Sequence, residues 1–298
     1  MTSIHSSNPA QPNTNPTNQS EAHLNRDEFA NPVYVDPNAK LPRIQALRGP
    51  SENLCGYFVS VDQMALAGWL DFKSDQLITY PFESSGKQEE GILIASPRML
   101  VCPKSPVLAF DRKLTQESKN GPVILGRYTT NMKTEANYGN LQYFQVYLLD
   151  ANNQPLHQVP LMYRATGANQ ATFAIHWQEF CHQLETCHAI VNQIPARPKN
   201  SAFRCLGVFS FNTSRELAGD KQKSFACKVI QHEIPTLQNW RDYFVGFSPI
   251  KEAVWEGLEP SSPLLIPDAT QLALTGIEES AINLSSLEGN PNPSNSDF

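Results

Sequence analysis

The segment HWQEFCHQLETCH, residues 176–188, contains the densest group of side chains able to bind a metal ion. Its potential ligands are His176, Cys181, His182, Cys187 and His188. Ligands on one helix must share a face, and Cys181 and His188 do, whereas Cys181 and Cys187 point about 240° apart. Zinc ligands usually stand in short paired spacings on turns. The pattern therefore favours an amphipathic helix with polar histidines on its outer face and predicts no metal site.

Other catalytic patterns do not occur in the sequence. Nothing resembles G-x-S-x-G, H-E-x-x-H or a Walker loop, and GVFSFNTSRELAGDK has Gly, Ser and Lys without phosphate-loop spacing. The acid pairs Glu89–Glu90 and Glu278–Glu279 lie in polar stretches typical of solvated carboxylates. We therefore predict no catalytic residue, no cofactor and no enzymatic activity. An enzyme whose site assembles from scattered residues around His176–His188 is kept as an alternative.

Short segments rich in aromatic and β-branched residues supply the elements that position any site. Strands are expected in QLITYPF, GILIASPRMLVC, PVLAF, LQYFQVYLLD, PLMYRA, FRCLGVFSF and KSFACKVI. Helices are expected at 61–69, at 174–193, in LQNWRDYF and in IKEAVWEGL. The helix at 174–193 has an apolar stripe of Trp177, Phe180, Leu184, Cys187 and Val191. Many strands without βαβ alternation predict an α+β, antiparallel β-rich fold, with an OB-like barrel as its specific form.

Composition divides the chain into three parts. Residues 1–40 are rich in Asn, Pro, Ser and Thr, which predicts a disordered arm. Residues 41–260 form the expected β-rich globular core, and residues 261–298 an acidic disordered tail. The chain shows neither a secretory signal nor a run long enough to span a bilayer. Its six cysteines lack a CxxC pair, so we predict small buried thiols and a cytoplasmic location.

The chain has a formal net charge of -6, but its charged residues are distributed unevenly along the sequence. Residues 101–250 carry fifteen Lys and Arg against ten Asp and Glu, whereas residues 251–298 carry one Lys against eight acids. Aromatic residues alternate with these cations, and Tyr138, in the turn-like segment YGN, is expected to be exposed. Cations neutralise phosphates while rings stack on unpaired bases, which predicts a single-strand-binding surface. Its candidate residues are Arg112, Lys113, Arg127, Tyr128, Lys133, Tyr138 and Arg164.

The carboxy-terminal segment NPNPSNSDF ends in Asp297 and Phe298. It resembles the acidic tails of bacterial and phage single-stranded DNA-binding proteins. In that family the tip docks on replication and repair proteins, with the ring in a hydrophobic hollow and the carboxylates near basic residues. The resemblance implies replication or recombination proteins as partners of Asp297 and Phe298. This chain departs from the family in lacking several consecutive acids at the tip.

A wider resemblance covers much of the core. It begins at LPRIQALRG and continues through CGYFV, PRMLVCPKSPVLAFDRK and GVFSFNTSRELAG. These segments are similar to an uncharacterised cyanobacterial family known as a domain of unknown function. The PRIQ opening is also similar to small phage and plasmid proteins that accompany recombination functions. Neither resemblance implies an activity or site residues, but both favour a DNA-maintenance setting over metabolism.

Together these observations predict a cytoplasmic, non-enzymatic protein that binds single-stranded DNA or RNA without sequence preference. Its acidic tail would recruit partner proteins. The alternative is a protein–protein adaptor or a structural component of a phage- or plasmid-derived assembly, in which the β surface binds protein and the tails are linkers.

Overall fold

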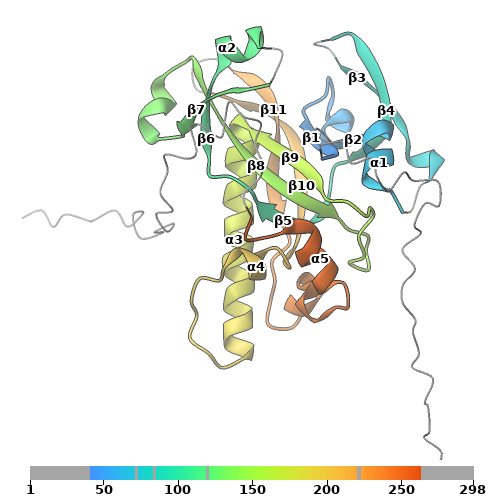
Figure 1. Ribbon diagram of the computed structural model, residues 1–298, viewed down its shortest axis with the longest axis vertical. Helices are drawn as coiled ribbons and strands as arrows, with labels where there is room; N and C mark the ends of the chain where they lie inside the picture. Colours follow the sequence, from blue (N-terminus) through green and yellow to red (C-terminus); the bar gives the residue numbers. More distant parts are fainter. Residues whose placement is uncertain (1–40, 71–72, 83–84, 119–120, 220–222, 263–298) are drawn as a thin grey trace, which may run out of the picture. The chain divides into compact units, whose positions relative to one another are not determined.

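The computed structural model describes residues 41–70, 73–82, 85–118, 121–219 and 223–262. Within these ranges the chain adopts a mixed α/β fold, in which a curled mixed sheet forms a half-barrel accompanied by five α-helices (Figure 1). The β-rich character expected from the sequence is confirmed. The predicted arm at 1–40 and the tail from residue 263 onward lie outside the described residues.

One sheet contains all the strands that the structure describes. They are β1 (Arg43–Leu47), β2 (Gly56–Ser60), β3 (Ile78–Phe82), β4 (Lys87–Ile94), β5 (Arg98–Pro103), β6 (Leu108–Asp111), β7 (Val123–Arg127), β8 (Tyr138–Leu148), β9 (Leu161–Thr166), β10 (Val208–Ala218) and β11 (Ser224–His232). The main order is β11-β10-β5-β8-β9-β1-β2-β4-β3, and β6 joins it by pairing with β8 and β7. Among these strands only β1 and β9 pair in parallel, with Ile44 opposite Tyr163.

The helices are unequal in length and role. They are α1 (Val61–Ala67), α2 (Arg112–Glu117), α3 (Gly167–Val191), α4 (Ser201–Arg204) and α5 (Lys251–Leu258). The long α3 packs against β8, β9, β10 and β11 and so covers one face of the curled sheet, which we call the inner face (Figure 1). The opposite face is called the outer face below.

The helix expected at 174–193 is confirmed as α3, although it begins earlier. Its predicted stripe is buried except for Val191, which is the last residue of the helix and is 42% exposed. The expectation that the histidines lie on the outer side of the helix was wrong for two of them. His182 is exposed, but His176 and His188 are half-buried, because the elements that follow α3 in the chain pack over those positions.

Other sequence expectations are confirmed in outline and corrected in detail. The expected helices at 61–69 and in IKEAVWEGL are present as α1 and α5. GILIASPRMLVC divides into two strands, and FRCLGVFSF begins as helix α4 before entering β10. LQNWRDYF forms only the 3₁₀ turn η4 (Trp240–Tyr243). The segment YGN opens strand β8 instead of forming an exposed turn, because it pairs with β6.

An aromatic cluster joins α3 to the inner face. The Phe173 ring is fully buried and lies 5.1–5.7 Å, centroid to centroid, from four neighbouring rings. These neighbours are Phe144, Tyr163, Phe209 and Phe211. The Tyr163 hydroxyl donates to Asn169 Oδ1, so its polar end is satisfied within the core. All six cysteines are also buried and free of disulfides, as the sequence predicts.

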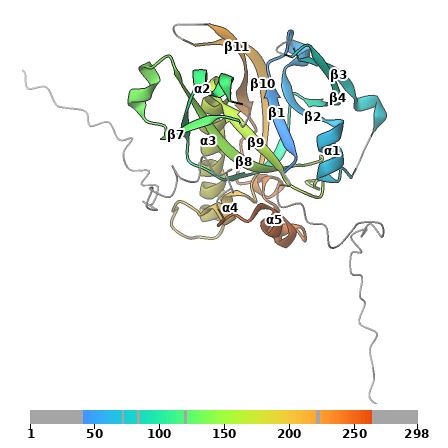
Figure 2. The same cartoon turned by 45° about the horizontal axis from the view of Figure 1, so that its top comes forward.

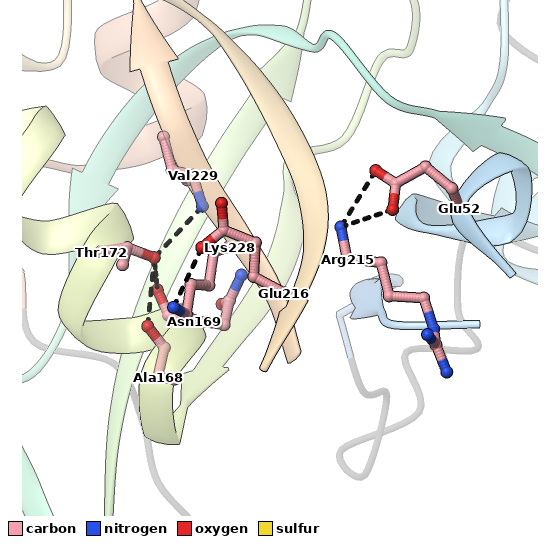
Figure 3. Close-up of polar contacts among 8 residues, drawn as sticks. All are labelled: Glu52, Ala168, Asn169, Thr172, Arg215, Glu216, Lys228 and Val229. Atoms are coloured by element: carbon pink, nitrogen blue, oxygen red, sulfur yellow. Dashed lines mark hydrogen bonds and ion pairs between the residues drawn. The ribbon is translucent and has the colours of Figure 1, made fainter. Parts of the chain in front are cut away.

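The segment after β1 contacts the β10–β11 hairpin. The Glu52 carboxylate accepts the backbone N–H of Arg215 through both oxygens at 3.1 Å (Figure 3). Arg215 Nε also donates to Gly49 O at 3.0 Å. Gly49 has φ +58° and lies too close to Leu54 for any side chain, so glycine is required there. On the other side of the hairpin, Thr172 Oγ1 of α3 accepts from Val229 N at 3.2 Å. These bonds hold the hairpin from both sides.

His157 is fully buried between two aromatic rings. Its ring stacks on Trp69 at 5.5 Å and on Tyr147 at 5.3 Å, measured between centroids. Nε2 accepts a hydrogen bond from Leu148 N, which makes Nδ1 the protonated nitrogen that donates to Val159 O at 2.8 Å. Burial lowers the pKa of His157 to about 4.

His157 is expected to make the stability of the protein depend on pH. Its folded pKa of about 4 lies below the ordinary value of 6.5, so the unfolded chain takes up a proton first as the pH falls. Above the ordinary pKa, His157 makes its full contribution to the free energy of unfolding. This contribution, about 3 kcal/mol, is lost as the pH falls from the ordinary pKa to the folded one. Chemical denaturation at several pH values measures this loss. In H157Q the slope of the free energy of unfolding against pH should decrease by the equivalent of about one proton. An unchanged slope would contradict the low pKa assigned to His157.

Candidate nucleic-acid interface

A second, smaller core lies on the outer face of the sheet. It is formed by Leu108, Leu141 and Tyr143, with Phe110, Ile124 and Met162 packed against it. Because side chains alternate along a strand, Tyr143 points away from the α3 side, toward which its neighbour Phe144 points. Strands β6 and β7, helix α2 and the turn η3 (Thr130–Thr134) surround this core together with the start of β8. We call residues 107–140 the β6–β7 lobe.

The β6–β7 lobe contains six of the seven residues proposed from the sequence. Arg112 and Lys113 open α2, Arg127 ends β7, Tyr128 follows it, Lys133 lies in η3 and Tyr138 opens β8. Figure 2 shows α2 and β7 at one side of the half-barrel, away from α4 and α5. Residues that are up to 26 positions apart in the chain are thus brought to one part of the surface.

Hydrogen bonds tie α2 to the beginning of β8. Asp111 caps α2, since its carboxylate accepts from Leu114 N at 2.9 Å. Arg112 N donates to Asn137 O at 2.9 Å, and Arg112 Nε donates to Tyr138 O at 3.0 Å. Arg112 therefore both offers a charge to solvent and keeps Tyr138 beside the helix.

The lobe presents more positive than negative charge to solvent. Its exposed cations are Arg112, Lys113, Arg127 and Lys133. Among the described residues of the lobe, Glu117 and Glu135 are the exposed carboxylates, because Asp111 is half-buried at the cap of α2. Tyr128 and Tyr138 are half-buried, which corrects the expectation that Tyr138 is exposed.

The seventh candidate, Arg164, lies on β9 next to the lobe. It stands opposite Tyr143 in the β8–β9 register and is exposed on the outer face. Burial raises the pKa of the Tyr143 hydroxyl, and Arg164 opposes this rise through its charge and a hydrogen bond. Arg164 therefore extends the cationic surface from the lobe onto the sheet. Asp297 and Phe298, the proposed partner-binding residues, lie outside the described residues.

A second cation–aromatic surface was missed by the sequence reasoning. The Phe247 side chain is 65% exposed, and the Arg241 guanidinium lies 5.6 Å from its ring centre. Both residues line a pocket of about 440 Å³ beside Phe244 and Val245. The run WRDYFVGF carries the signal, since it places an arginine among four aromatic residues, but the exposure of one ring depends on the tertiary packing.

The fold and the lobe together define the class of protein. It is a β-rich half-barrel packed on one long helix, with a cationic lobe on its outer face. The chain belongs to the family described as Domain of unknown function (DUF5895), which matches residues 38–275. This family membership confirms the resemblance to a domain of unknown function. No curated protein and no solved structure matches the chain. Among the described residues, no helix is both long enough and apolar enough to cross a membrane.

Proposed function

We propose that this protein binds single-stranded DNA or RNA without sequence preference, through the β6–β7 lobe and Arg164. The observation that carries the proposal is the presence of four exposed cations and two tyrosines on one lobe. Cations on such a surface neutralise phosphates and release counterions, and half-buried tyrosine rings offer faces on which unpaired bases stack. Neither contact selects a particular base, so the binding is sequence-independent.

The proposal extends to the architecture and the setting of the protein. In OB-folds a strand face and its adjoining loops bind oligonucleotides, and here the outer face of β8 and β9 with the lobe would serve as the OB-like platform. No catalytic residue or cofactor is part of the proposal. Asp297 and Phe298 would recruit replication or recombination proteins, and the protein would act in the cytoplasm.

Replacing Arg127 and Lys133 together with alanine is expected to weaken the binding of oligo-dT. If each cation contacts one phosphate, the slope of log K against log salt should flatten by about 1.4. Fluorescence anisotropy of labelled oligo-dT at several salt concentrations measures both effects on the full chain.

The matched control for this pair is K87A/R197A. Lys87 and Arg197 are exposed cations outside the lobe, so the control removes the same charge from elsewhere on the surface. It should keep the slope of the unmodified protein. Equal effects of the two double substitutions would mean that net charge alone attracts the strand, and an absence of oligo-dT binding at low salt would refute the proposal.

A protein-binding adaptor is the second candidate function. It is favoured by the pocket of about 440 Å³ in which Phe247 is 65% exposed beside Arg241. An exposed ring next to a guanidinium is typical of protein-binding hot spots, which are enriched in aromatic residues and arginine. If oligo-dT does not bind, this surface becomes the leading candidate site.

A further inference from the structure

Two histidines that are distant in the sequence meet at the boundary between α3 and β11. His176 lies in α3, and His232 is the last residue of β11. Their Nδ1 atoms are 2.9 Å apart. Glu179 stands three residues after His176 on the same helix face, and one ligand atom from each of the three residues lies within 4.8 Å of the others. The three side chains thus converge on one point.

A hydrogen bond from the helix sets the protonation of this pair. Gln183 Oε1 lies 3.1 Å from His232 Nε2 and can only accept, so Nε2 carries the proton. The lone pair of His232 is therefore on Nδ1, which faces His176. Burial lowers the pKa of His232, the neighbouring His176 lowers it further, and the Glu179 carboxylate opposes this shift. The hydrogen bond from Nε2 to Gln183 therefore fixes the orientation of the His232 ring.

We propose that His176, Glu179 and His232 form a binding site for a divalent transition-metal ion, with Zn²⁺ as the best match. Two imidazole nitrogens and one carboxylate are a donor set that zinc accepts, and three protein ligands leave its fourth position to water. Glu179 is exposed, so that fourth position is open to solvent. The ion would connect the middle of α3 to the end of β11.

The two histidines require only a small adjustment on binding. Two nitrogens bound tetrahedrally at about 2.0–2.1 Å from zinc stand about 3.3 Å apart. The two Nδ1 atoms, at 2.9 Å, must therefore separate by a few tenths of an ångström. Without metal, His176 Nδ1 donates its proton to His232 Nδ1. To bind the ion through Nδ1, His176 would carry its proton on Nε2 instead. Rotation of the two rings supplies the movement without a change in the backbone.

The ligand set differs from the one considered in the sequence. Cys181 is buried in the core, and Cys187 Sγ lies 3.6 Å from Pro235 O. The His188 ring packs on Phe203, with 5.0 Å between centroids. Of the residues in HWQEFCHQLETCH, His176 and Glu179 supply ligands to the proposed site, together with a histidine from another element.

Titration of the full chain with ZnCl₂ tests this site. Isothermal titration calorimetry should show a binding event that H176A and H232A each weaken on the order of 100-fold, and Q183A by about 10-fold or more. Saturating Zn²⁺ should raise the thermal unfolding midpoint by on the order of 5 °C. Co²⁺ bound at the site should lack a thiolate charge-transfer band, which separates the site from binding by cysteines.

H182A is the matched control, because His182 is an exposed histidine on the same helix. It should bind Zn²⁺ like the unmodified protein. E179Q removes an exposed ligand and should leave folding intact, so its loss of affinity, with an unchanged far-ultraviolet circular dichroism spectrum, supports the site even if H232A fails to fold. Equal Zn²⁺ affinity in the unmodified protein, E179Q and H176A would overturn the proposal.

Discussion

Replacing Phe173 with alanine is expected to lower the free energy of unfolding by about 4 kcal/mol. The ring is fully buried and contacts aromatic residues of β8, β9 and β10, so its removal leaves a cavity between α3 and the inner face. Rings that surround such a cavity lose dispersion contacts and relax only partly. Small domains are stable by only about 5–15 kcal/mol, so this single change would remove a large share of the total.

Urea denaturation of F173A and I175A measures this effect against a matched control. Ile175 lies two residues further along α3, and its side chain is 55% exposed. Its removal should cost less than about 0.5 kcal/mol, as is usual for surface substitutions. Equal costs for the two variants would contradict the packing of α3 in the half-barrel.

Replacing Arg204 with alanine is expected to cost about 3 kcal/mol. Arg204 Nε donates to Glu185 Oε1 at 2.7 Å, and the Glu185 side chain is only 7% exposed. Without Arg204 this carboxylate would remain buried without its opposite charge. The pair connects α3 to α4, so its loss also loosens the segment that leads into β10.

The control for this prediction is the more exposed ion pair Lys228–Glu216. Its nitrogen–oxygen distance is 3.0 Å, but the Glu216 side chain is 47% exposed. Water screens such a pair, so K228A should cost less than about 1 kcal/mol. Replacing both members of the buried pair, as E185M/R204M, should recover most of the stability lost in R204A, because no unpaired charge is left behind. A double variant as unstable as R204A would show that Arg204 acts through packing instead.

The nucleic-acid interface and the metal site differ in how far the sequence alone could predict them. Six of the seven candidate nucleic-acid-binding residues lie in the lobe, from Arg112 to Tyr138, where α2, β7 and η3 follow one another by short connections. A stretch in which cations alternate with aromatic residues therefore stays together after folding. The sequence did not predict the exposure of individual residues in the same way. Tyr138, for example, pairs with Asp111 across β6 and β8 and becomes half-buried.

The His176–Glu179–His232 site had no such local signal. Its helical part, His176 and Glu179, is visible as an i, i+3 pair, but its other ligand is 56 residues from His176. The sequence segment around His176 offered nearer cysteines and histidines as ligands. The packing of α3 excludes the cysteines as ligands, because it turns Cys181 and Cys187 into the core.

The sequence by itself determined the local elements of this protein. Short runs of aromatic and β-branched residues predicted most strands, spacing of three and four predicted α3, and apolar surroundings predicted the burial of the cysteines. Tertiary structure decided the parallel pairing of β1 with β9, the curl of the sheet into a half-barrel and the meeting of His176 with His232. The physical reason is that periodicity reflects which face of an element is buried, whereas pairing between distant elements depends on packing free energy summed over the whole core.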